Sequence, residues 1–129
     1  MWNRNKVREG KKPSKNLLET AFTLLNSKVR RPLLDRGGKY AYETEKGILV
    51  AKDKPYGNLV SCTARAVLIA KNRELPLLMY IAQNDTIYEF NVDEILKLDD
   101  VNERIMTKNG KKIKIKMLNF GLRNGRKLE

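Results

Sequence analysis

The sequence predicts an α/β fold: a single domain with a mixed sheet in the order helix, three strands, helix, two strands, followed by a basic β-hairpin. Helical and strand-like hydrophobic periodicities alternate along the chain, and Asn109-Gly110 separates two short strand-like stretches near its end. A length of 129 residues, 41% of them hydrophobic, suits one core rather than two. We therefore expect a basic arm at 1–15, an α/β core at 16–98, and a basic hairpin with a C-terminal tail at 99–129.

The core begins with an amphipathic helix predicted over residues 17–28. Apolar residues from Leu18 to Leu25 recur at helical spacing. Asn16 is followed three residues later by Glu19, the pattern of a capping box at a helix N-terminus. The arm before this helix contains glycine and proline and little periodicity, so we expect it to be flexible.

Three strands are predicted after this helix. Val29–Leu34 is extended in character, and Pro32 makes it an edge or irregular strand because proline cannot donate to a sheet. Residues 39–45 alternate and are rich in tyrosine, and residues 48–54 run back after a tight reversal at Gly47. The tyrosines of this region and Tyr56 offer stacking surfaces, but as strand and turn aromatics we expect them to pack against the body.

A second helix is predicted where apolar residues from Val60 to Leu75 follow helical spacing, with Pro76 ending it. The single cysteine, Cys62, falls at the start of this helix and cannot form an internal disulfide. Without histidine it lacks the usual catalytic base, so we interpret it as a small packed residue.

A buried strand pair follows the second helix. Residues 77–82 form a continuous apolar run of strand length, and Asn84-Asp85 predicts a hairpin turn into residues 86–92. Asp93 is predicted to cap a short helix after this pair.

The charge is concentrated at the two ends of the chain. Lys and Arg number 27 against 15 Asp and Glu, a formal net charge of +12. Residues 1–15 carry a net +5, residues 108–129 carry +7, and the stretch between them is neutral. Basic extensions suit a polyanion, and we expect nucleic acid, DNA in particular, rather than a membrane surface. The basic residues expected to contact it are Lys11, Lys12, Lys15, Lys111, Lys112, Lys114, Lys116, Arg123, Arg126 and Lys127.

Within the C-terminal hairpin, Lys112, Lys114 and Lys116 alternate with apolar residues. Alternate side chains of a strand share a face, so the three ammonium groups lie about 7 Å apart, close to the phosphate repeat of one nucleic-acid strand. The competing interpretation is an edge strand protected from aggregation by its lysines.

The composition excludes several classes of site. The chain has no histidine, which excludes Ser-His-Asp triads and histidine zinc sites. It contains neither a P-loop nor a GxGxxG motif. No apolar run approaches a membrane span or a signal peptide, so we expect a cytoplasmic or other reducing intracellular location.

Four residues form a catalytic hypothesis. Carboxylates at Glu19, Asp35 and Glu43, if they converged, would hold Mg²⁺, which prefers oxygen ligands, and Lys52 would stabilise charge that develops on a phosphate. Ordinary surface charge is the competing interpretation.

The order of the elements in the α/β core resembles that of the PD-(D/E)XK nuclease superfamily, and its layout is similar to archaeal Holliday-junction resolvases and small viral nucleases. The resemblance matches Glu19, in NLLETAFTLL, with the acid of the family's first helix. It matches Glu43, in KYAYETE, with the metal-binding acid of the second strand, for which Asp35 is a substitute. In ILVAKDK it matches Lys52 with the lysine of the acid-x-lysine pair, but Val50 stands at the acid position and cannot ligate a metal.

Two functions follow from this resemblance and the charge. The first is a nucleic-acid-binding protein on a nuclease-like core without catalysis. The second is a Mg²⁺-dependent endonuclease, in which Asp53 or Glu45 replaces the missing acid. A third, independent of the resemblance, is a basic assembly protein that binds a protein partner. Whether the chain forms a homodimer stays open.

Overall fold

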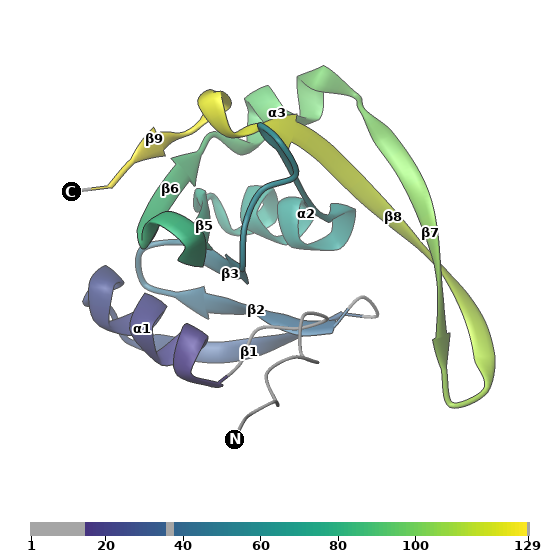
Figure 1. Ribbon diagram of the computed structural model, residues 1–129, viewed down its shortest axis with the longest axis horizontal. Helices are drawn as coiled ribbons and strands as arrows, with labels where there is room; N and C mark the ends of the chain where they lie inside the picture. The colour runs from purple at the N-terminus through teal and green to yellow at the C-terminus, as the bar shows by residue number, and fades with distance from the viewer. Residues whose placement is uncertain (1–14, 36–37, 129) are drawn as a thin grey trace.

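The computed structural model describes residues 15–35 and 38–128, within which two sheets form the body (Figure 1). The large sheet has the strand order β1-β2-β3-β5-β6-β9 and the small sheet the order β4-β8-β7. The strands of the large sheet are β1 (Val29–Asp35), β2 (Gly38–Thr44), β3 (Ile48–Lys52), β5 (Leu77–Ile81), β6 (Thr86–Phe90) and β9 (Arg126–Lys127). Those of the small sheet are β4 (Leu59–Thr63), β7 (Val101–Lys108) and β8 (Lys111–Gly121).

Helices connect and cover these strands. Over the described residues the α-helices are α1 (Lys15–Leu25), α2 (Ala64–Arg73) and α3 (Val92–Leu98), and short 3-10 helices are η2 (Ala82–Asn84) and η3 (Leu122–Asn124). Neighbouring strands are antiparallel except β3 and β5, which are parallel. A parallel pair needs a long crossover, and the chain supplies it with β4 and α2. The predicted fold class, a single mixed α/β domain with a C-terminal hairpin, is confirmed.

Alternate residues of a strand point to opposite sides, so the large sheet has two faces. Both faces are buried by the elements packed against them. On one face Leu49 and Leu78 pack against Ala21 and Leu25 of α1. On the other face the central strands pack with α2, α3 and the small sheet, in a core that includes Phe120. The predicted apolar strand is confirmed, since every residue of β5 is buried.

Several boundaries differ from the prediction. The first helix ends at Leu25 rather than residue 28, because Asn26 adopts a left-handed conformation with φ 53°. The third helix is capped by Asn91, whose Oδ1 accepts from the backbone nitrogens of Asp93 at 2.9 Å and Glu94 at 3.2 Å, so the predicted cap at Asp93 is wrong.

The helix predicted from Val60 is wrong at its start. Residues 59–63 form β4, with Val60 and Cys62 buried, and α2 begins only at Ala64. The spacing from Val60 to Ala64 is compatible with both periods, so the apolar pattern did not separate a strand from a helix there. The Thr63 side chain accepts from the backbone nitrogen of Ala66 at 3.2 Å and caps α2.

The C-terminal region is integrated into the body. The turn between β7 and β8 has positive φ at Asn109 (54°) and Gly110 (77°), as a two-residue hairpin requires, so that prediction is confirmed. Beyond β8 the expected tail forms β9, which pairs with β6 at the edge of the large sheet. Of the predicted arm at residues 1–15, residues 1–14, with Lys11 and Lys12, lie outside the described residues, and Lys15 begins α1.

Candidate functional site

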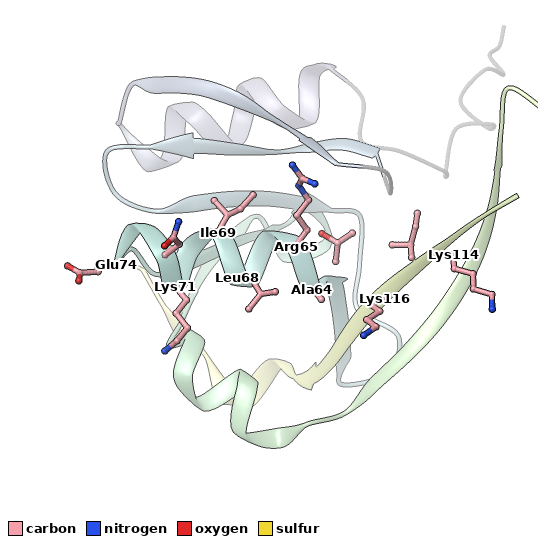
Figure 2. A pocket seen from close by; sticks show the side chains of 11 residues that line it. Ala64, Arg65, Leu68, Ile69, Lys71, Glu74, Lys114 and Lys116 are labelled. Atoms are coloured by element: carbon pink, nitrogen blue, oxygen red, sulfur yellow. The ribbon is translucent and has the colours of Figure 1, made fainter. Parts of the chain in front are cut away.

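A groove of about 930 Å³ lies between α2 and β8 (Figure 2). Its apolar lining comes from Ala64, Leu68 and Ile69 on α2 and from Ile115 on β8. Leu68 is 53% exposed, which leaves an apolar surface accessible on the helix. Such a surface can contact bases or apolar side chains of a ligand.

Cationic side chains stand on both walls of this groove. Arg65 comes from α2, and Lys114 and Lys116 come from β8; all three are exposed. Within the described part of the chain, none of the three has a carboxylate within 4.0 Å. The groove therefore presents cations that form no ion pair within the described residues, although Glu103 of β7 lies opposite Lys116 in the strand register.

The remaining charges of the groove lie toward the C-terminal end of α2. Lys71 Nζ donates to Asp93 Oδ1 at 2.6 Å. That hydrogen bond, with the charge of Lys71, holds the pKa of Asp93 below its ordinary value of 3.8. Glu74 is exposed and also lines the groove. The end of the groove near Arg65 and the lysines of β8 is thus more positive than the end near Glu74.

The pairing of β4 with β8 positions the positive end. Thr63 pairs with Met117, so the first turn of α2 begins beside Lys116. The positive end of the helix dipole adds to the charge of the side chains there. Sequence reasoning missed Arg65 and Leu68, because it did not separate β4 from α2. The spacing of Arg65 and Leu68 could have indicated that they belong to one site, since residues three apart on a helix share a face.

The predicted alternation along β8 is confirmed. Lys112, Lys114 and Lys116 are exposed, whereas Ile115 and Met117 are buried. In Figure 1 the hairpin formed by β7 and β8, here called the ribbon, extends well beyond the body at the end that carries the lysines. The basic row therefore lies on a projecting element that a large ligand can approach.

The other basic residues are distributed over different surfaces. Lys111 is exposed at the tip of the ribbon and Arg123 is exposed in η3. Arg126 and Lys127 are exposed on β9, where Arg126 forms an ion pair with Glu89. Lys15 is the first residue of α1.

A second, smaller hollow of about 280 Å³ contains further basic residues. Lys52, Lys54 and Arg104 line it together with Tyr56. Tyr56 is 89% exposed, so the expectation that it packs against the body is wrong. Tyr42 does pack, edge-to-face on Phe22 with ring centroids 5.3 Å apart.

The structure does not bring the predicted catalytic residues together. Glu43 pairs with Ile48 at the first residue of β3, whereas Lys52 is the last residue of that strand, about 13 Å away at the usual rise. Asp35 pairs with Gly38 at the opposite end of β2 from Glu43. Glu19 is exposed on α1, across the large sheet from the side on which Glu43 contacts α2. The strand register therefore separates Glu43 from Lys52 and places Asp35 at the end of the sheet that holds Lys52.

Glu43 is instead surrounded by arginines. Its side chain is 3% exposed and lies near Arg73 of α2 and near Arg30 and Arg31 of β1. The hydrogen bond from Arg73 Nε, at 3.1 Å, is the main reason that the pKa of Glu43 lies below its ordinary value of 4.5, against the effect of burial. Among the described residues no three Asp, Glu, Cys or His side chains gather as metal ligands.

Comparisons with protein-family models, curated protein sequences and solved structures found no match. The PD-(D/E)XK relationship stays a prediction, and Val50, at its acid position, is buried in the core. Along residues 15–35 and 38–128, no helix has both the length and the apolar character needed to cross a bilayer.

Proposed function

We propose that the protein binds nucleic acid, with DNA as the expected form, through the ribbon and the groove beside it. One observation carries this proposal: the exposed lysine row of β8 leads into a groove whose opposite wall holds Arg65, with no carboxylate within 4.0 Å of Arg65, Lys114 or Lys116 among the described residues. A row of cations at phosphate spacing binds a polyanion by releasing its counterions.

The shape of the ribbon also supports a nucleic-acid ligand. A two-stranded β-ribbon fits the major groove of B-DNA, where its side chains reach phosphates on either side. The apolar surface at Leu68, next to Arg65, adds contact area that is indifferent to base sequence. We therefore expect binding with little sequence preference.

The endonuclease alternative has no comparable support. In the form that uses Glu43 with Lys52 on one phosphate, the strand register separates the two residues; the form that uses Asp35 keeps its acid at the Lys52 end of the sheet but has Val50, which cannot ligate a metal, at the acid position beside Lys52. The assembly-protein alternative needs a protein partner with an acidic surface, which would bind the same basic residues. Such an acidic protein can be added to the DNA-binding assay below as a competitor of the labelled DNA.

The proposal is tested by the salt dependence of binding. We expect the double variant Lys114→Gln/Lys116→Gln to lose two phosphate contacts, which lowers the log–log slope for a DNA duplex by about 1.8. Between 50 and 200 mM salt, the wild-type affinity should then fall by about 12-fold more than that of the variant. Fluorescence anisotropy with a labelled duplex measures both slopes.

A matched control removes the same charge elsewhere. Lys97 is exposed on α3 and lines neither described hollow, so Lys97→Gln should leave the slope near that of the wild type, whereas Lys114→Gln or Lys116→Gln alone should lower it by about 0.9. Equal slopes for Lys97→Gln and the two β8 variants, or no DNA or RNA binding at 50 mM salt, would refute the proposal. Deleting residues 108–129 is not a usable test, because Leu118 and Phe120 belong to the core.

A further inference from the structure

Three guanidinium groups converge on one buried carboxylate at the edge of the large sheet. Arg73 Nε lies 3.1 Å from Glu43 Oε1, Arg31 Nε lies 3.5 Å from the same oxygen, and an Nη of Arg30 lies 3.6 Å from Oε2. Glu43 is 3% exposed, whereas the side chains of Arg73, Arg30 and Arg31 are 38%, 49% and 61% exposed. The carboxylate is inside and the cations face outward.

A β-bulge brings the two neighbouring arginines to the same side. Consecutive residues of a regular strand point to opposite faces, so Arg30 and Arg31 would diverge. In β1 the register shifts between Val29, which pairs with Thr44, and Arg31, which pairs with Glu43. Arg30 is the extra residue of that step, and such an irregularity re-aims a side chain. The irregularity at the edge strand therefore concentrates the positive charge.

The charges in this cluster do not balance. Within 4.0 Å, one carboxylate faces three guanidinium groups, which leaves an excess of positive charge among these four side chains. Arg31 and Arg73 approach Glu43 through Nε, so the edge formed by the two Nη groups of each guanidinium is not the edge that contacts Glu43. A guanidinium fork matches the oxygens of a phosphate, and several forks held together match it better.

We propose that Arg30, Arg31 and Arg73, positioned by Glu43, form a binding site for a phosphate group. Glu43 is a positioning residue here: it holds the three side chains close together despite their mutual repulsion. The ligand is a phosphate of a nucleic-acid end or backbone, or a small phosphorylated compound. This site does not depend on the nucleic-acid proposal, although Arg73 follows Asn72 of the groove lining directly in α2.

The first experiment measures binding of inorganic phosphate. Sodium phosphate is titrated into the protein at pH 7 by calorimetry, against sodium chloride of equal ionic strength. We expect the wild type to bind phosphate and Arg30→Gln/Arg31→Gln to bind at least tenfold more weakly, because two of three forks are removed. The single variant Arg31→Gln, at the most exposed of the three, should also weaken binding, and it serves if the double variant is unfolded by circular dichroism.

The matched control is Arg126→Gln. Arg126 is paired one-to-one with Glu89, so it lacks the excess charge of the cluster, and its loss should leave phosphate affinity unchanged. Wild-type protein that shows no phosphate binding beyond chloride would overturn the proposal. So would arginine variants of the cluster that bind phosphate as well as Arg126→Gln does.

A second arm identifies the source of the phosphate. An oligonucleotide with a 5′-phosphate is compared with the same oligonucleotide ending in a hydroxyl group. If the phosphate strengthens binding and the cluster variants abolish that gain, the ligand is a nucleic-acid end. If both oligonucleotides bind alike while inorganic phosphate still requires the cluster, the ligand is an internal or small-molecule phosphate. If no oligonucleotide binds, the nucleic-acid proposal fails. The titration with inorganic phosphate then still decides whether the arginine cluster is a phosphate site.

Discussion

Replacing Glu43 by glutamine tests whether the arginine cluster stabilises the fold. The hydrogen bond from Arg73 Nε, at 3.1 Å, is the strong contact, and a charged hydrogen bond contributes on the order of 2 kcal/mol. The contacts of Arg30 and Arg31 are longer and half-exposed, so solvent screens them and they add little. We expect Glu43→Gln to lose about 2 kcal/mol of unfolding free energy, a fall in Tm of about 8 °C at pH 7.

The loss should depend on pH. The pKa of Glu43 in the folded protein is lowered from 4.5, principally by Arg73, so its ionised form stabilises the fold fully above pH 4.5. That contribution is lost as the pH falls from 4.5 through the lower folded-state pKa. The Tm difference between wild type and Glu43→Gln should therefore be largest near pH 7 and narrow steadily below pH 4.5.

Thermal unfolding followed by circular dichroism between pH 7 and pH 3 measures this difference. Glu45→Gln is the matched control, because Glu45 is exposed two residues away and has no ion pair with any described residue. It should change Tm little at any pH. A Tm gap for Glu43→Gln that is absent at pH 7, or equally large at pH 3, would show that the carboxylate does not act as described.

Two further predictions concern packing. A Cβ at Gly47 would lie 2.7 Å from the backbone oxygen of Pro76 and 2.8 Å from Leu78 Cγ, so Gly47→Ala should cost about 2 kcal/mol, and urea unfolding that shows no loss would contradict this close approach. Phe90 and Phe120 meet edge-to-face with centroids 4.9 Å apart, so a double-mutant cycle of the two leucine variants should give a coupling of about 1 kcal/mol, whereas additive losses would contradict the contact.

The centre of the fold was predictable because its local signals agree. The apolar run of β5 is too short and too uniformly hydrophobic for a surface helix, so it predicts a buried strand. Asn109-Gly110 specifies a two-residue turn, which predicts the hairpin of β7 and β8. The alternation along β8 likewise identified which lysines are exposed.

Elements that depend on distant partners were not predictable in this way. β9 has two residues and no apolar pattern, and it is a strand only because β6 pairs with it and the nitrogen of Leu128 donates to Ile87. The role of Glu43 depends on the bulge at Arg30 and on the end of α2, neither of which leaves a pattern in the residues around it. A carboxylate in an alternating strand looks the same in sequence whether it faces a metal or three arginines.

The pairing of β4 with β8 also determines when the groove can exist during folding. It joins Thr63, in the middle of the chain, to Met117 near its end, and contacts over such separations form slowly because a long loop must close first. Until they form, α2 has no second wall facing it. A ligand held between α2 and β8 therefore recognises only the finished molecule and stabilises it by binding the folded state alone.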